Sequence, residues 1–200
     1  MYGKRQTLIF DSSTLIGCEK ARIFSNYSEK LSAYFVLGIC NESYEELQKG
    51  KSKENMRIRN LIKLNAISIL NDANASTTAY EAANKYNLDL ADVSGLILAK
   101  KLNTLFLIDD IKFFRQKFTI KDSVLDYDNY LPFSFILLTL FKLKLIDDNT
   151  MRMLFCEIIN KNNWKRSEVE KAANELIHIE LGYYIVCHDV ITKKEIYELK

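Results

Sequence analysis

The sequence has little proline and glycine, no long apolar run and no excess of charge of either sign. One Pro and six Gly in 200 residues argue against long irregular loops. The 28 Lys and Arg residues nearly balance the 26 Asp and Glu residues, so composition alone does not identify a nucleic-acid-binding protein. The longest apolar stretch, residues 131–141, is shorter than the ~20 residues of a membrane span. We therefore expect a globular, cytoplasmic protein with no membrane association.

Several motifs that would assign a function are also absent. The four cysteines form no Cys-x-x-Cys pair, which predicts free buried thiols and neither a disulfide framework nor a zinc finger. They are Cys18, Cys40, Cys156 and Cys187. With only two His residues, a Ser-His-Asp triad has no support, and without a glycine-rich phosphate loop neither has a nucleotide-hydrolysing or dinucleotide-binding role. The apolar run before Asp11 is too short for a signal peptide.

What the sequence does contain is an alternation of short apolar runs with helical patterns. The runs are continuously apolar, as is typical of strands that are covered on both faces of a parallel sheet. They occupy residues 7–10, 35–39, 66–70 and 104–108. Strands that alternate with helices in this way predict a three-layer α/β/α sandwich with a mostly parallel central sheet.

The second part of the chain is predicted to be helical. We expect an α/β domain over residues 1–122 and a helical C-terminal extension over residues 123–200. Helical patterns cover residues 131–143, 147–160 and 167–181, followed by a short strand at 183–186 and a short helix at 192–200. The pattern at 131–143 is so apolar that we expect part of it to form a homodimer interface.

Acidic residues follow two of the predicted strands directly. Asp11 follows the first apolar run, and Asp109 and Asp110 follow the fourth. Active sites of open parallel sheets form just outside the carboxyl ends of the strands. Glu46 lies on the helix after the second predicted strand, and Asp92 opens the helix before the fourth. We therefore expect all these acids near one edge of the sheet.

Each of these acids taken singly is typical of a helix cap or a solvated helix residue. Together they predict a cation site, because carboxylates ~5 Å apart repel by about 3 kcal/mol per pair at an effective dielectric constant of 20. Ligands that are all oxygen favour Mg²⁺ or Mn²⁺ over zinc.

The four acidic segments, in this order, resemble the PIN-domain nucleases. The segments are LIFDSSTLIG, YEELQKG, LDLADVSGLILAKKL and TLFLIDDIKFF. The resemblance covers residues 5–122, and it implies a PIN-like fold. The stretch FKLKLIDDNTMRMLFCEIINKNNWKRSEVEKA is similar to the helical tail of a prokaryotic PIN-like subfamily.

The resemblance implies hydrolysis of RNA phosphodiester bonds with Mg²⁺ or Mn²⁺. Asp11 would be the central metal ligand, Asp92 and Asp110 would complete the metal shell, and Glu46 would hold a second metal or the attacking water. Ser13 would hydrogen-bond a carboxylate or a bound water, and a helix N-cap is the alternative for this hydroxyl.

Two assignments within the acidic segments stay open. An Ile stands two residues before the last acid, where the family often has Thr, so Asp109 is an alternative to Asp110 as metal ligand. Glu42 and Glu45 compete with Glu46, and the Glu-Leu-x-x-Gly spacing favours Glu46.

An RNA substrate also requires cations beside the acids, because phosphate contacts come mainly from Lys and Arg. One candidate cluster is Lys51, Lys53, Arg57 and Arg59, and the better placed one is Lys112, Arg115 and Lys117. Solvated helix faces are the alternative interpretation of both clusters. The sequence thus predicts a metal-dependent ribonuclease. This ribonuclease could be the toxin of a toxin-antitoxin pair, in which case an antitoxin protein is its partner. The alternatives are a catalytically weak PIN-like module that binds RNA or a protein, and a structural domain whose acids only cap helices.

Overall fold

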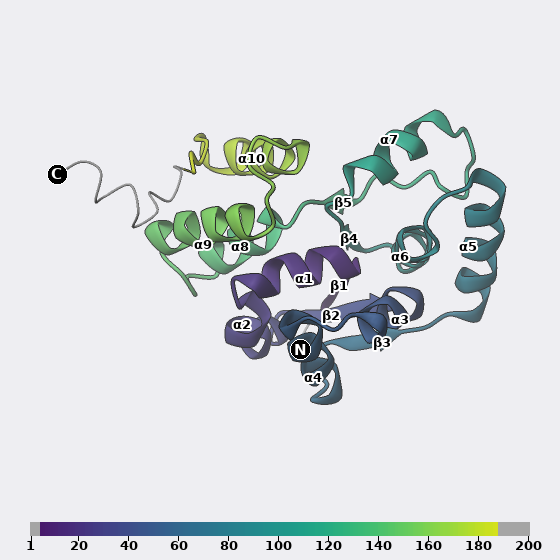
Figure 1. The fold of residues 1–200 in the computed structure, drawn as a ribbon, viewed down its shortest axis with the longest axis horizontal. Helices are drawn as coiled ribbons and strands as arrows, with labels where there is room; N and C mark the ends of the chain where they lie inside the picture. Colours follow the sequence, from purple (N-terminus) through teal and green to yellow (C-terminus); the bar gives the residue numbers. More distant parts are fainter. Residues whose placement is uncertain (1–4, 188–200) are drawn as a thin grey trace.

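A computed structural model describes residues 5–187 of the chain. Within this range it contains a five-stranded sheet whose pairings are all parallel, in the order β3-β2-β1-β4-β5, together with ten helices (Figure 1). The strands are β1 (Gln6–Phe10), β2 (Phe35–Cys40), β3 (Ser68–Leu70), β4 (Leu105–Leu107) and β5 (Tyr130–Leu131). The prediction of an α/β protein with a parallel sheet is confirmed.

The strands are continuously apolar because both faces of the sheet are buried. Successive side chains of a strand point to opposite faces. In β1, Leu8 and Phe10 belong to one hydrophobic cluster, and Ile9 belongs to a second cluster on the other face. All three side chains are fully buried, so neither face of β1 tolerates the polar residues that would mark a half-exposed strand.

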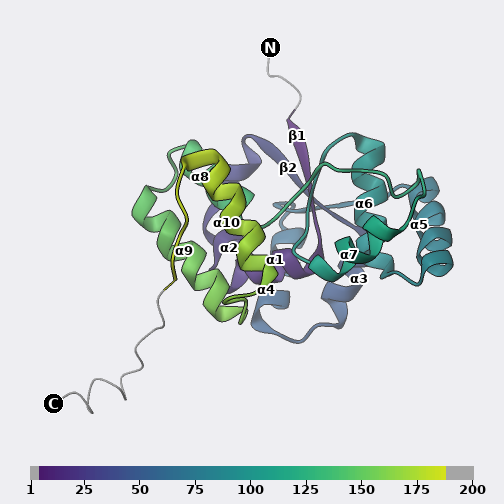
Figure 2. The same cartoon turned by 90° about the horizontal axis from the view of Figure 1, so that it is seen from above.

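Helices cover both faces of the sheet, and Figure 2 shows them divided around it. The first cluster takes side chains from α1 (Ser12–Lys20), α2 (Ile23–Ser32), α3 (Asn41–Lys49), α4 (Lys53–Lys63), α8 (Ser134–Lys142), α9 (Asp148–Lys161) and α10 (Glu168–Leu181). The second cluster takes them from α5 (Ala73–Tyr86), α6 (Leu90–Leu102) and α7 (Ile111–Thr119). Helix α3 also packs against α6.

The three C-terminal helices share the core of the α/β part. Phe133 and Phe155 lie in the same cluster as Leu8 and Phe10 of β1. The ring centroids of Phe133 and Trp164 are 5.9 Å apart. Trp164 approaches α1 so closely that a Cβ at Gly17 would lie 2.9 Å from its ring. A side chain larger than hydrogen at Gly17 would therefore push the turn between α9 and α10 away from α1.

Two expectations about the C-terminal part change with the structure. Strand β5 lies after residue 122 but pairs with β4, so the sheet extends past the predicted boundary. The apolar side chains of α8 are buried or half-buried within the chain, because α9 and α10 pack against this helix. The apolar pattern at 131–143 is therefore explained without the homodimer that we expected from it.

The cysteines differ from the prediction of four free thiols. Cys156 on α9 and Cys187 form a disulfide with a Cα–Cα distance of 5.2 Å, whereas Cys18 and Cys40 are free and buried. The prediction was wrong for the first pair because α10 reverses the chain between residues that are 31 positions apart. Sequence spacing alone does not indicate such a reversal.

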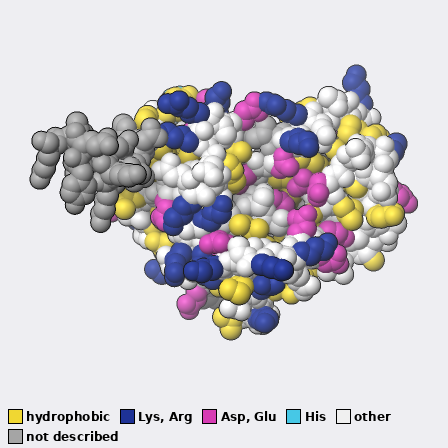
Figure 3. All heavy atoms as spheres, viewed as in Figure 1, with side chains coloured by type: hydrophobic (Ala, Val, Ile, Leu, Met, Phe, Trp, Pro, Cys, Tyr) yellow, Lys and Arg dark blue, Asp and Glu magenta, His cyan; other side chains and the backbone are white. Residues whose placement is uncertain are grey.

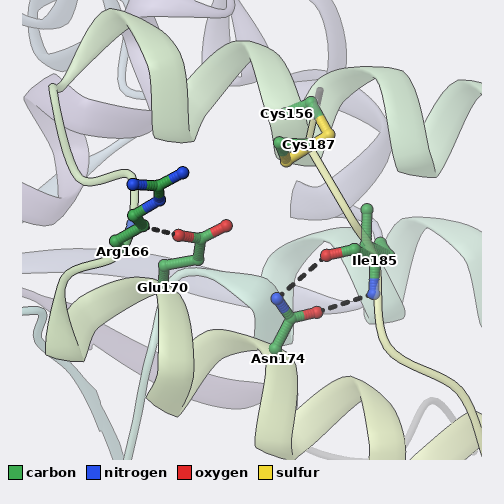
Figure 4. The surroundings of a disulfide bond; sticks show 6 residues. All are labelled: Cys156, Arg166, Glu170, Asn174, Ile185 and Cys187. Carbon is green, nitrogen blue, oxygen red and sulfur yellow. Dashed lines mark hydrogen bonds between the residues drawn. A yellow bond between two sulfur atoms is a disulfide. The ribbon is translucent and has the colours of Figure 1, made fainter. Parts of the chain in front are cut away.

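The segment after α10 is held in place without being a strand, contrary to our prediction for residues 183–186. The carboxamide of Asn174 on α10 accepts a hydrogen bond from the Ile185 backbone N–H at 2.8 Å and donates one to the Ile185 carbonyl at 3.1 Å (Figure 4). These bonds occupy the backbone groups that a strand partner would use. The helix predicted at 192–200 lies outside the described residues.

Among residues 5–187, no helix is long and apolar enough to cross a membrane.

Candidate functional site

The strand order places a crevice at the ends of β1 and β4. Strand β2 pairs with one edge of β1, and β4 pairs with the other edge of β1, so the strand order reverses at β1. Ligands of open parallel sheets bind at such a reversal, outside the carboxyl ends of the strands. The backbone N–H of Asp11 donates to the Leu107 carbonyl at 2.9 Å, which fixes the ends of β1 and β4 side by side.

Asp11 is buried at this edge and caps α1. One oxygen of its carboxylate accepts hydrogen bonds from the Ser13 backbone N–H at 2.9 Å and from the Ser13 hydroxyl. Burial raises the pKa of Asp11, the Ser13 bonds lower it, and the nearby charge of Asp110 raises it again. The N-cap of α1 is therefore Asp11, and the Ser13 hydroxyl orients the Asp11 carboxylate.

Asp92 is a carboxylate of the site with a strongly raised pKa. It lies in the first turn of α6 and is only 5% exposed, and no donor within residues 5–187 hydrogen-bonds its carboxylate. Burial raises the pKa of Asp92 to about 9, with smaller contributions from neighbouring negative charges. These charges belong to Asp11, Asp89, Asp110 and Glu46. A buried carboxylate with no donor is costly unless it binds a proton or a cation.

The structure separates the two adjacent acids that follow β4. Asp109 is buried, and its two oxygens accept hydrogen bonds from the Thr14 hydroxyl at 2.9 Å and from the Phe133 backbone N–H at 3.0 Å. Burial raises the pKa of Asp109 to about 7, although both hydrogen bonds lower it. Asp109 thus connects α1 to the start of α8 and has no oxygen without a donor.

Asp110, unlike Asp109, lies in the crevice at the ends of the strands. It caps α7 by accepting hydrogen bonds from the backbone N–H groups of Lys112 at 2.7 Å and Phe113 at 3.1 Å. It also lines a pocket together with Asp92. Asp110 is therefore the acid of the pair that belongs to the cluster.

Of the three glutamates that compete on α3, Glu46 faces the site. Its carboxylate accepts a hydrogen bond from the Ser12 hydroxyl at 2.6 Å. Partial burial raises the pKa of Glu46, and the charges of Asp89 and Asp11 raise it further. The carboxylate of Glu45 instead accepts a hydrogen bond from the Asn41 side chain at 3.1 Å.

Our sequence reasoning missed Ser12 and Asp89. The Ser12 hydroxyl orients Glu46 across 34 residues of sequence, a contact that no local pattern encodes. Asp89 caps α6 by accepting hydrogen bonds from the backbone N–H groups of Ala91 at 2.8 Å and Asp92 at 3.4 Å. The two acids three residues apart in LDLADV were the available signal for Asp89.

An open pocket of about 430 Å³ lies over these carboxylates. Asp89, Asp92 and Asp110 contribute to its lining, together with Lys112, Phe113 and Gln116 of α7. Figure 3 shows acidic side chains gathered along a hollow of this face, with Lys and Arg side chains on both sides of the hollow.

The acids converge without forming a complete ligand set. Among the described residues, no three His, Cys, Asp or Glu side chains are placed to hold one metal ion as they stand. Several of them nevertheless raise the pKa of one another through charge repulsion. Repulsion of this kind keeps carboxylates apart until a cation neutralises them.

Most of the predicted RNA-binding cations are engaged within the protein. Lys117 is 5% exposed, and its ammonium donates to the Tyr127 carbonyl at 2.6 Å. Arg115 forms an ion pair with Glu168 of α10. Lys112 is exposed at the pocket.

In the cluster that precedes it in the sequence, Arg57 is paired within the protein and Arg59 lies at a pocket. The guanidinium of Arg57 lies 2.7 Å from the carboxylate of Glu19, which is fully buried, so this pair joins α4 to α1. Within residues 5–187, Arg59 donates only to the Gln48 carbonyl, at 3.0 Å. This part of α4 borders a second open pocket.

Comparison with known proteins gave no matching family model, no matching curated protein and no matching solved structure.

Proposed function

We propose that this protein is a divalent-metal-dependent ribonuclease whose centre is the acidic cluster at the ends of β1 and β4. The observation that carries the proposal is Asp92, a buried carboxylate without a donor on the wall of an open pocket. A folded protein retains such a group at a cost, and binding a cation removes that cost. The PIN-like fold suggested by the four acidic segments belongs to the same proposal.

The available donors suit a hard divalent cation. Asp11, Asp92 and Asp110 offer oxygen ligands, which favours Mg²⁺ or Mn²⁺. A bound ion of this kind neutralises phosphate charge and lowers the pKa of a coordinated water. Ser13 and Ser12 hold the carboxylates of Asp11 and Glu46 in fixed orientations at the cluster.

The other residues of the site have roles that suit a phosphodiester substrate. Lys112 is exposed at the pocket and supplies a positive charge for a phosphate. Glu46 accepts a proton from, or orients, a water on the α3 side of the cluster. The pocket is open, so a polymer can cross it without threading through the protein. An antitoxin partner remains part of the proposal only through the sequence resemblance.

A second candidate is a PIN-like module that binds RNA or a protein without cutting. It is favoured by the capping roles of Asp11, Asp89 and Asp110, which explain these acids without a metal. Neither Asp92 nor Glu46 caps a helix through its side chain, and this favours the enzyme.

A cleavage assay separates the two candidates. The full chain is incubated with a mixture of single-stranded and structured RNAs in Mn²⁺, Mg²⁺ or EDTA. We expect fragments with Mn²⁺ or Mg²⁺ and none with EDTA. RNA that binds but stays intact in both metals would support the binding module, and cleavage that persists in EDTA would contradict the metal mechanism.

A further inference from the structure

A second open pocket, of about 540 Å³, lies between α3 and α4. We call it the α3–α4 groove, and its lining residues are Tyr44, Gln48, Met56, Arg59, Asn60 and Lys63. Met56 is 50% exposed, although it is a large apolar side chain. The groove therefore combines an exposed apolar surface with side-chain amides and two cations.

Besides Arg59 and Lys63 in the groove, three further lysines lie on the same two helices or between them. Lys49, Lys51, Lys53, Arg59 and Lys63 all lie on α3, on α4 or between them. None of the five forms an ion pair within residues 5–187, whereas the neighbouring Arg57 pairs with Glu19 and Glu54. Arg59 and Lys63 line the groove itself, and a group of cations that form no ion pair attracts a polyanion.

Helix α3 connects this group to the acidic cluster. Glu46 faces the cluster, and Lys49 follows it by one helical turn. The charge of Lys49 lowers the pKa of Glu46, against the larger effect of burial, so the two charges are close in space. A chain bound along α3 therefore passes from the cations to the acids within a few residues of protein.

We propose that the α3–α4 groove binds a single-stranded segment of RNA next to the phosphodiester that is cut at the acidic cluster. The five cations contact phosphates, and Tyr44 and Met56 contact an unstacked base. The carboxamides of Gln48 and Asn60 offer donors and acceptors for the edge of that base. Duplex RNA does not present an unstacked base, so the groove favours single strands.

This inference rests on the proposed ribonuclease function for its substrate. An acidic protein segment is the competing occupant, since it also suits five cations. The observations favour RNA, because the lining combines an aromatic ring with amide side chains and because the groove shares α3 with the proposed cutting site.

The test measures RNA binding of the full chain in EDTA, so that hydrolysis plays no part. The probe is a fluorescent 12-nucleotide single-stranded RNA, titrated by anisotropy at several salt concentrations. The variant is Lys49→Ala/Lys53→Ala/Lys63→Ala, whose side chains make no hydrogen bond or ion pair within the described range. We expect at least a tenfold weaker affinity and a salt slope smaller by about 2, since each contact to a single strand contributes ~0.7.

The control variant removes the same charge from other surfaces of the protein. It is Lys30→Ala/Lys121→Ala/Lys171→Ala, in which all three lysines are exposed. We expect its RNA affinity and salt slope to differ little from those of the wild type. An equal loss of affinity in both triple variants would overturn the groove, because it would indicate a diffuse charge effect.

Two further probes address the kind of occupant. We expect Met56→Ala to lower the affinity for single-stranded RNA and to leave the affinity for a duplex of the same sequence unchanged. An unchanged affinity for RNA, together with a loss of poly-glutamate binding in the first triple variant, would overturn the proposal in favour of a protein segment.

Cleavage in Mn²⁺, measured separately, distinguishes this inference from the proposed function. RNA binding through the groove without cleavage in any metal would refute the proposed ribonuclease activity and leave the proposed RNA-binding role of the groove standing. Cleavage with an unchanged affinity in the first triple variant would refute the groove and retain the ribonuclease.

Discussion

Asp92 and Asp109 are both buried carboxylates, and their surroundings give them different roles. Asp109 has a donor for each oxygen, so it links α1 to the start of α8. Asp92 has no donor among the described residues and adjoins several other negative charges. Of these two carboxylates, only Asp92 would therefore be stabilised by a bound cation. The buried fraction alone does not distinguish Asp92 from Asp109.

Glu46 and Glu45 provide a matched test at this scale. They are neighbours on α3, but Glu46 faces Ser12 and the cluster, whereas Glu45 contacts Asn41. We predict that Glu46→Gln lowers the Mn²⁺-dependent cleavage rate by ~10–100-fold, because the charge next to Asp11 is lost. Glu45→Gln removes the same charge and is expected to change the rate less than twofold. Steady-state cleavage of one RNA by both variants measures the difference, and equal rates would contradict the assignment.

The sequence predicted these acids better than it predicted their partners. Asp11 and the pair Asp109 and Asp110 were noted because apolar runs end before them, which is a local pattern, and the PIN-like resemblance favoured Asp110 of the pair. Ser12 as the partner of Glu46 and Thr14 as the partner of Asp109 depend on contacts across 34 and 95 residues. Such contacts arise only when the sheet has formed.

At the scale of elements, the disulfide holds the chain after α10 against α9. Cys156 and Cys187 close a loop that contains α10, and Asn174 fixes the same segment through Ile185. Both attachments act on a segment of five residues with no helix or strand of its own.

We predict that Cys156→Ser lowers the free energy of unfolding by about 2–4 kcal/mol under oxidising conditions, because the loop closed by the disulfide then gains entropy in the unfolded chain. Urea unfolding with and without a dithiol reductant measures this change. The reductant should destabilise the wild type by a similar amount and affect the variant little. Identical unfolding midpoints without reductant would contradict a stabilising disulfide.

The elements that the sequence predicted are those with strong local patterns. The four longer strands were found because burial on both faces makes them continuously apolar, and α9 and α10 begin where Asp147 and Ser167 cap them. Strand β5 has two residues, too few for any pattern, and is defined by its pairing with β4. The strand predicted at 183–186 is wrong because a short run of Tyr, Ile and Val does not specify a pairing partner.

At the scale of the whole molecule, the raised pKa values make stability depend on pH. Asp92 and Asp109 have pKa values of about 9 and about 7, far above the ~3.9 of an unfolded Asp. Between these limits the folded protein binds protons that the unfolded chain has lost, so the free energy of unfolding falls as the pH rises. Hydrogen bonds from Tyr86 and other groups lower the pKa of Asp122 to about 2. Its stabilising effect is constant above pH ~5, because Asp122 is ionised in both states there, so it adds no pH dependence in this range.

We predict that the metal-free protein loses stability steadily from pH 5 to pH 8, measured by urea unfolding in EDTA. Asp92→Asn should make this slope shallower and stabilise the protein at pH 8 by more than ~1.4 kcal/mol, the equivalent of one pKa unit. The exposed Asp126→Asn serves as the charge control, with the slope of the wild type. Stability that is constant or rises over this range would contradict the raised pKa values of the buried acids.

In the function that we propose, the acids at the ends of β1 and β4 bind a divalent metal, and a Mn²⁺ titration of the wild type and Asp11→Asn tests this binding. Asn caps a helix as well as Asp does, so α1 and the metal-free fold should be preserved. We expect the melting temperature of the wild type to rise with Mn²⁺, because the ion binds the folded state. In Asp11→Asn we expect a much smaller rise and a loss of RNA cleavage in the same samples. An equal rise and equal cleavage in both proteins, or no rise in either, would contradict this expectation.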